Sequence, residues 1–139
     1  MENQLPENQR IATALLLLRL GVFIVMIIWT LDKFVNPQHS AAVFENFYGL
    51  GGLSETAFMF IGLLQLLVVL AFVAGFMKHI SYGIVLLLHG ASTLSSWQQY
   101  LDAFNNLLFF AAWPMLAACI ALYMLRDLDT RFTVDDRRR

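Results

Sequence analysis

The sequence predicts an all-α fold, a bundle of four helices that spans a membrane, and three observations predict it. Of the 139 residues, 59% are hydrophobic and 14% are charged, whereas soluble domains carry nearer a quarter of charged residues. The hydrophobic residues fall into four long runs. Each run is close to the roughly 20 residues that a helix needs to cross the hydrocarbon core of a bilayer. We therefore treat residues 1–139 as a single membrane domain.

The four expected spans share this length and a near absence of charge, and they cover residues 11–31, 55–76, 80–97 and 104–125. Pro37 follows the first span, and a proline disfavours helical conformation in the residue before it. A short polar connection, residues 77–79, joins the second span to the third. Pro114 removes one backbone hydrogen bond near the middle of the fourth span, so we expect a kink there.

The longest connection, between the first and second spans, is expected to hold a short amphipathic helix. Ala41, Phe44, Phe47 and Tyr48 recur at helical spacing within it. Such a helix can lie in the membrane interface with its apolar side inward. Ser54 stands just before the second span and is a candidate N-cap, because its hydroxyl can accept from a free backbone N–H of the first turn.

The basic residues predict the orientation of the four spans. The two termini and the connection 77–79 share one side of the membrane, and that side carries Arg10, Lys78, Arg126, Arg131, Arg137, Arg138 and Arg139. The other side carries Lys33. Because cytoplasmic segments carry the excess of Lys and Arg, both termini are expected in the cytoplasm. The expected location is the inner (cytoplasmic) membrane of a bacterium.

Cysteine content and charge exclude several classes of function. Cys119 is the only cysteine, so this chain alone forms no internal disulfide, no paired-thiol redox centre and no iron–sulfur cluster. The net charge is −1, whereas a nucleic-acid partner needs a basic patch. We expect membrane lipid as a partner, and no nucleic acid.

Arg19 is the leading functional residue, because it interrupts an apolar run that should carry no charge. A charge within a span usually faces a protein interior, a water pocket or a ligand. Counted from the cytoplasmic ends of their spans, Arg19, Gln65 and His89 lie about 12, 16 and 14 Å deep. The three side chains are therefore expected in one polar layer, and helix bundles commonly build ligand sites in this way.

No acidic residue is expected to share this layer, so we expect Arg19 to lack an acidic partner in its own chain. Four alternatives remain open for its guanidinium. It can be satisfied by Gln65 and His89 through water, by an acid of another subunit, or by a bound carbonyl or anion. It can also extend along lipid to the cytoplasmic headgroups.

A second polar set is expected at the outer surface, and its members are Asp32, Lys33, Glu55 and Asn105. Asp32, His39 and Glu55 have side chains that bind metals, but their spacing matches no metal-site pattern. We predict a solvated loop there and no metal.

Four short motifs stand out: residues 17–21 (LLRLG) with Phe23, residues 32–34 (DKF) with Pro37, residues 62–65 (GLLQ) with the downstream Gly75, and residues 131–135 (RFTVD). The first two resemble the opening of the DoxX-like family of small four-helix membrane proteins, which is related to DoxD-type membrane subunits. The third looks like the second helix of that family, and the fourth is similar to its closing segment.

This resemblance implies a membrane component associated with redox chemistry. Relatives of that kind include the membrane subunit of thiosulfate:quinone oxidoreductases and members linked to thiol and superoxide defence; the wider group also resembles cargo receptors with no enzymatic role. The family often has a glutamate where this chain has Gln65, so the resemblance implies no simple Arg–Glu pair here.

Three functions are consistent with the sequence. The first is an accessory subunit of a membrane redox complex that binds a quinone between its helices, with no covalently held cofactor. Arg19 and His89 would bond the quinone carbonyls, Gln65 would orient one of them, and Trp29 or Phe23 would flank the ring. The second is a structural or assembly subunit among other membrane protein subunits, without chemistry of its own. The third is a lipid- or cargo-binding membrane protein. No residue is assigned a catalytic role.

Overall fold

The computed structural model describes residues 6–138, and every regular element among them is helical. The long helices are α1 (Glu7–Val35), α3 (Glu55–Val73), α4 (Lys78–Ser95) and α6 (Ala112–Met124). The shorter elements are α2 (Pro37–Tyr48), α5 (Trp97–Leu101), the 3₁₀ turns η1 (Ala103–Asn105) and η2 (Leu107–Ala111), and α7 (Val134–Arg137). The all-α prediction is confirmed.

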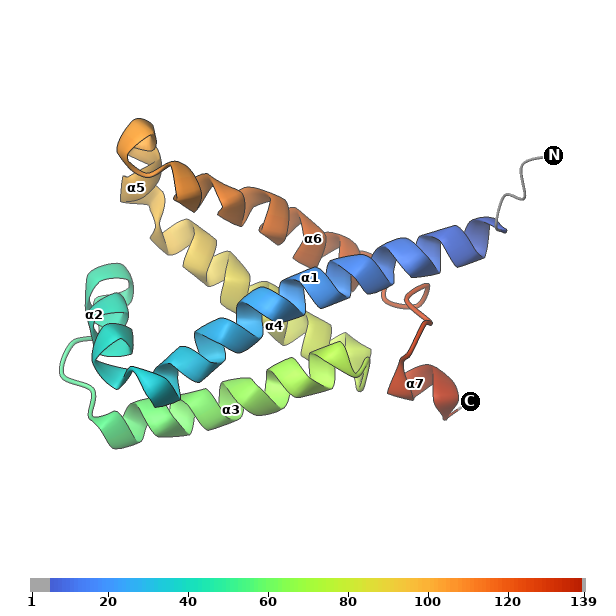
Figure 1. Cartoon of the computed structure of the whole chain (residues 1–139), viewed down its shortest axis with the longest axis horizontal. Coiled ribbons are helices and arrows are strands. Elements are labelled where there is room, and N and C mark those ends of the chain that lie inside the picture. The colour runs from blue at the N-terminus through green and yellow to red at the C-terminus, as the bar shows by residue number, and fades with distance from the viewer. Residues whose placement is uncertain (1–5, 139) are drawn as a thin grey trace.

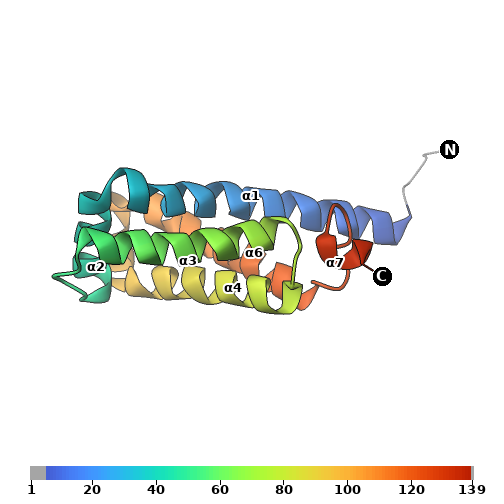
Figure 2. The ribbon, with the colours of Figure 1, turned by 90° about the horizontal axis from the view of Figure 1, so that it is seen from below.

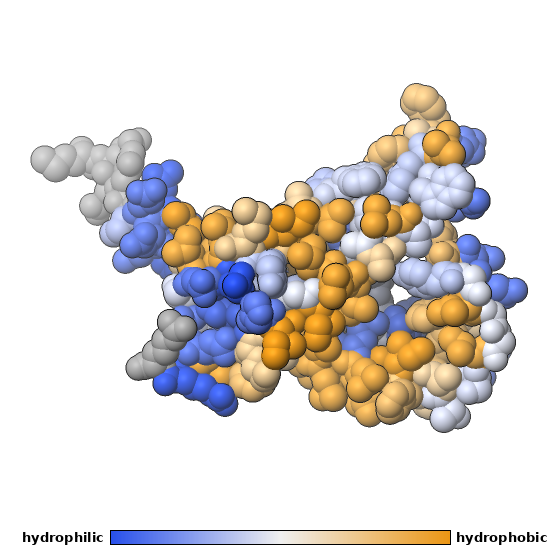
Figure 3. All heavy atoms as spheres, turned by 180° about the vertical axis from the view of Figure 1, so that it is seen from behind, coloured by the Kyte–Doolittle hydropathy of each residue, from blue (hydrophilic) through white to orange (hydrophobic). Residues whose placement is uncertain are grey.

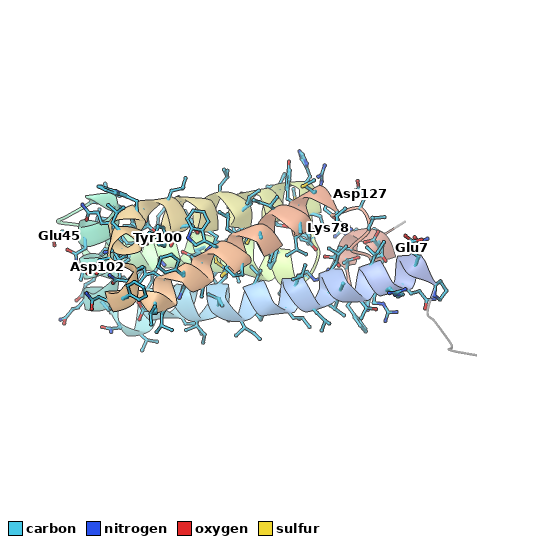
Figure 4. All side chains as sticks on the ribbon, turned by 90° about the horizontal axis from the view of Figure 1, so that it is seen from above. Glu7, Glu45, Lys78, Tyr100, Asp102 and Asp127 are labelled. Carbon is cyan, nitrogen blue, oxygen red and sulfur yellow. The ribbon has the colours of Figure 1, made fainter. Side chains whose placement is uncertain are left out.

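The four long helices lie side by side (Figure 2). Helices α2 and α5 lie at one end of this bundle, and α7 lies at the other, from which both termini leave (Figures 1 and 2). Glu45 and Asp102 mark the first end, and Lys78 and Asp127 mark the second (Figure 4). We call these the α2 end and the terminal end.

The core receives side chains from all four long helices. Its fully buried members are Leu15, Val22, Met26, Val69, Phe72, Tyr82, Val85, Cys119 and Leu122. On α1 the buried positions are 12, 15, 19, 22, 26 and 30, which recur every three or four residues and so form one stripe on the helix. Arg19 occupies a position of this stripe, where an apolar residue is the rule.

Within the described residues, three helical segments are long and apolar enough to cross a membrane, namely Glu7–Val35, Glu55–Val73 and Leu107–Met124. Large apolar side chains such as Leu17, Ile24 and Leu67 are exposed on their outer faces. Apolar residues cover the middle of the face in Figure 3, and hydrophilic ones gather toward its ends. An exposed apolar surface of this kind suits a bilayer.

The third expected span, 80–97, corresponds to α4, which is less apolar than α3 and α6. Its 18 residues are long enough for a membrane span, but they are not apolar enough to count as one of the three segments above. Its buried side is polar and includes Ser81, Tyr82, His89 and Thr93. Because those groups face the other helices, they lower the hydropathy of α4 while its exposed side keeps Ile80, Leu87 and Leu94.

The fourth expected span, 104–125, is not one continuous α-helix. Asn106 lies between the two 3₁₀ turns and is not helical, and α-helical geometry begins only at Ala112. Pro114 thus stands in the first turn of α6, where a missing backbone N–H is tolerated. The expected midspan kink at Pro114 is wrong, because the helix starts later than the apolar run does.

Two sequence predictions about the first long connection match the structure. Helix α2 spans the stretch that was expected to be helical. The Ser54 hydroxyl accepts from the backbone N–H of Ala57 at 3.2 Å and caps α3 as expected. Helix α2 also packs onto the bundle: the Phe44 ring lies edge-on to Phe58 of α3, with centroids 5.3 Å apart.

Candidate functional site

Arg19 has an acidic partner in its own chain, so the expectation that it lacks one is wrong. Its Nη1 lies 2.9 Å from Oδ2 of Asp129, and both side chains are at least 99% buried. The Tyr82 hydroxyl donates to the same carboxylate oxygen at 2.6 Å and accepts from Arg19 Nη1 at 3.2 Å. Arg19 Nη2 also donates to the backbone carbonyl of Arg131. Two atoms of this pair, Arg19 Nε and Asp129 Oδ1, are buried without a partner.

Asp129 reaches Arg19 because the chain after α6 folds back against the terminal end of the bundle. Lys78 Nζ donates to the backbone carbonyls of Arg126 and Asp129 at 2.9 and 3.0 Å, and it pairs with Asp136 at 2.8 Å. The Asp135 carboxylate accepts from the backbone N–H groups of Met77 and Lys78 and so caps the start of α4. We call residues 126–137 the C-terminal segment.

Gln65 and His89 are brought together, but Arg19 does not lie with them. Gln65, His89 and Trp29 line a cavity of about 670 Å³ at the α2 end. Arg19 lines neither this cavity nor the second one described below. Ten residues separate Arg19 from Trp29 on α1, which is about 15 Å along the helix. The expected single polar layer is therefore wrong: Arg19 belongs to the terminal end.

The cavity at the α2 end, which we call the outer cavity, has an aromatic wall and a few polar groups. Its aromatic members are Trp29, Phe44, Phe47, Tyr48 and Phe109. The Trp29 and His89 rings stack, with centroids 5.9 Å apart and an angle of 28° between planes. The Gln65 amide makes no hydrogen bond to another described residue, so its donor and acceptor are available to a molecule in the cavity.

A second cavity of about 570 Å³ lies between α1 and α6, and we call it the lateral cavity. Apolar and small residues line most of it, among them Leu17, Leu18, Gly21, Leu108 and Met115. Trp29, His89, Ser92, Ser96 and Phe109 line both cavities. The two cavities are therefore adjacent.

The other residues predicted for a site lie in different parts of the structure. Phe23 packs against the core and lines neither cavity. Asp32 and Lys33 line the outer cavity, where the Asp32 carboxylate bonds His39 Nδ1 at 2.6 Å and the Ser40 hydroxyl at 3.3 Å.

Glu55 and Asn105 do not join Asp32 and Lys33 at that cavity. Glu55 lies in the first turn of α3, and Asn105 bonds Asp102 at 3.0 Å. The four residues expected in the outer polar set therefore do not form one site.

Sequence reasoning missed Asp129 and Tyr82, which contact Arg19, and the α2 side chains that line the outer cavity. The only sequence signal for Asp129 was the density of acids after the last apolar run, at positions 127, 129, 135 and 136. Comparison with protein-family models, with curated proteins and with solved structures finds no match to this chain.

Proposed function

We propose that this chain is an integral membrane protein of four spans, α1, α3, α4 and the segment from η2 through α6, with both termini cytoplasmic. The three apolar segments support membrane insertion. Lys78, Arg126 and Arg131 lie toward the terminal end with both termini, and the positive-inside rule places that end in the cytoplasm. The outer cavity then lies toward the opposite face of a bacterial inner membrane.

The function that the geometry supports best is the binding of a membrane-dissolved ring compound of the quinone class in the outer cavity. The main observation in support is the cavity itself, where Trp29 stacks on His89 and the Gln65 amide makes no hydrogen bond to another described residue. A volume of about 670 Å³ falls within the ~300–1,000 Å³ of small-molecule sites, which combine apolar walls with a few polar groups. Aromatic walls and the stacked Trp29 and His89 rings suit a flat ring, and the Gln65 amide can bond one of its oxygens.

The lateral cavity supports the same proposal, because a quinone-class molecule carries a long apolar tail. The apolar lining between α1 and α6 offers that tail a place beside the lipid, adjacent to the ring site. Arg19 and Phe23 take no part in this site, so we revise the ligand set to Trp29, Gln65 and His89.

The chain offers no electron-transfer centre of its own among the described residues, so the proposal is an accessory quinone-binding subunit of a redox complex. A partner subunit supplies the electrons. The assembly-subunit alternative drew on an unpartnered Arg19, and the Arg19–Asp129 pair removes that reason for a partner's acid.

Equilibrium binding of a decyl-tailed benzoquinone to the protein in lipid nanodiscs tests the proposal. We expect saturable binding by the wild type. Trp29→Leu is expected to bind at least tenfold more weakly, because the stacking of the Trp29 ring on the ligand and the apolar area that it buries are lost together. Trp97→Leu is the matched control, since Trp97 is exposed and lines neither cavity. No saturable binding by the wild type, or equal losses in both variants, contradicts the proposal.

A further inference from the structure

The stretch after α6 is balanced in charge by its sequence, but the fold does not leave it balanced. Residues 126–138 hold four arginines and four aspartates. Asp129 pairs with Arg19 of α1 at 2.9 Å, and both side chains are buried. Asp136 pairs with Lys78 of α4 at 2.8 Å. Two of the four negative charges are therefore neutralised by cations that belong to other helices.

The four arginines of this stretch have no such partners. Within the described residues, none of them forms an ion pair with a carboxylate. Arg137 and Arg138 are exposed, and the other two are half-buried. The remaining aspartates are Asp127, which is exposed, and Asp135, which accepts from two backbone N–H groups at the start of α4. Four arginines thus stand against two aspartates, and the charge that the folded stretch presents outward is positive.

Apolar side chains are exposed beside these arginines. Phe132 is 72% exposed and Leu128 is 43% exposed. The stretch also begins where two apolar helices end, because α6 ends at Met124 and α3 ends at Val73. In the membrane orientation of the proposed function, on which this inference rests, the stretch lies at the level of the cytoplasmic headgroups. Arginines next to exposed apolar side chains suit the boundary between headgroups and acyl chains.

We infer that residues 126–138 form a binding surface for anionic phospholipid of the cytoplasmic leaflet. Guanidinium groups bond phosphate oxygens in pairs, and a negatively charged leaflet attracts a basic segment that follows a membrane span. A zwitterionic headgroup carries the same phosphate but adds a cation, which the arginines repel. The surface therefore prefers a lipid whose headgroup has a net negative charge, and Phe132 and Leu128 contact its acyl chains.

Lipid titration tests the inference. The probes are dioleoyl phosphatidylglycerol, which is anionic, and dioleoyl phosphatidylcholine, which is zwitterionic. Each is added to the full chain in detergent, and native mass spectrometry counts the lipids bound. We expect the first phosphatidylglycerol to bind more tightly than phosphatidylcholine by about fivefold or more, the effect of one basic residue near a membrane surface.

The outcomes separate this inference from the proposed function. Equal affinities of the two lipids, or tighter binding of phosphatidylcholine, overturn the inference and leave quinone binding in the outer cavity untouched. A chain that stays dissolved as a monodisperse protein without detergent contradicts membrane insertion itself.

A triple variant locates the preference in this stretch. Arg131→Gln, Arg137→Gln and Arg138→Gln together are expected to bring the affinities of the two lipids within about twofold of each other, because the positive excess is removed. Reaction of the buried Cys119 with a thiol reagent checks that the variant is folded. A folded triple variant with the full wild-type preference overturns the inference.

A second variant carries the opposite expectation. Asp127→Asn removes an exposed acid from the same stretch and is expected to raise the preference for phosphatidylglycerol. Glu45→Gln is its matched control, since Glu45 is also exposed but lies at the α2 end (Figure 4), and it is expected to leave the preference unchanged. No rise in Asp127→Asn, or an equal rise in both variants, overturns the inference. If the triple variant does not fold, the wild-type ratio and this pair of variants still decide.

Discussion

Arg19 and Asp129 show how a charge is accommodated inside this bundle. Each is almost fully buried, and the pair is supported by the Tyr82 hydroxyl and the Arg131 carbonyl. A buried ion pair is weak evidence for net stability, because desolvation offsets much of the attraction. Removing one partner alone is strongly destabilising, because it leaves the other charge buried and unpaired.

The first prediction concerns this pair. Arg19→Met and Asp129→Leu are each expected to lower the free energy of unfolding by about 3–5 kcal/mol, and the double variant is expected to lose much less than their sum. Unfolding can be followed in detergent by reaction of Cys119 with a fluorogenic thiol reagent, because this cysteine is the only one in the chain and is buried.

Arg10→Met is the control for this prediction. Arg10 is exposed, so its loss is expected to change stability by less than about 0.5 kcal/mol. Strictly additive losses in the double variant would show that Arg19 and Asp129 do not stabilise each other.

The sequence identified Arg19, since a charge in an apolar run is visible without a structure. Its partner was not visible, because Asp129 lies beyond the last span and reaches Arg19 only through a reversal of the chain. His89 and Gln65 were placed together correctly by depth. Arg19 was placed wrongly because α1 begins at Glu7 and extends past the bundle at the terminal end (Figure 2).

At the scale of elements, the turn between α3 and α4 packs against the C-terminal segment and is hydrogen-bonded to it. Helix α3 ends at Val73, and its C-cap Ala74 is followed by a glycine with φ +62°, Gly75. The Gly75 N–H bonds the Phe72 carbonyl, and the Phe76 N–H bonds that of Ala71. This is the hydrogen-bond pattern of a Schellman motif. The backbone N–H of Val134 then bonds the Ala74 carbonyl at 2.8 Å, which holds the C-terminal segment against the turn.

The second prediction follows from that contact. A Cβ at position 75 would lie 2.6 Å from Thr133 Cβ and 3.0 Å from its Cα. Gly75→Ala is therefore expected to cost about 2–4 kcal/mol, as strain from positive φ plus a steric clash. Gly49→Ala is the matched control, with φ +67° and no atom within 4 Å of the added Cβ. It carries the strain alone, about 1 kcal/mol. The thiol-reaction assay measures both, and equal losses would argue against the contact.

Helix boundaries were predicted best where local signals agree and worst where the fold decides. Ser54 marked the start of α3, and Pro37 marked the end of the first helix, α1, whose last residue is Val35. The apolar run 104–125 gave no sign that α-helical geometry begins only at Ala112. Hydropathy alone does not distinguish a 3₁₀ turn from an α-helix. The contact that His89 of α4 makes with the Ala112 carbonyl, at the first residue of α6, is between helices and is not visible in the local sequence.

At the scale of the whole molecule, the two main features of the structure lie at opposite ends of the bundle. The terminal end holds the buried ion pair and the C-terminal segment, and the α2 end holds the outer cavity. The two are about 15 Å apart along α1. Because of this separation, the binding site that we propose includes His89 and leaves out Arg19, although Arg19 is the most conspicuous residue of the sequence.

Photoaffinity labelling with a decyl benzoquinone that carries an aryl azide tests the location of the proposed site most directly. After irradiation in nanodiscs and digestion, mass spectrometry identifies the labelled peptides. We predict labels within residues 26–33, 37–48 or 88–96 that disappear when excess unlabelled quinone is present. Competed labelling confined to residues near Arg19 or within the C-terminal segment, or labelling that excess quinone does not reduce, would contradict the assignment of the outer cavity.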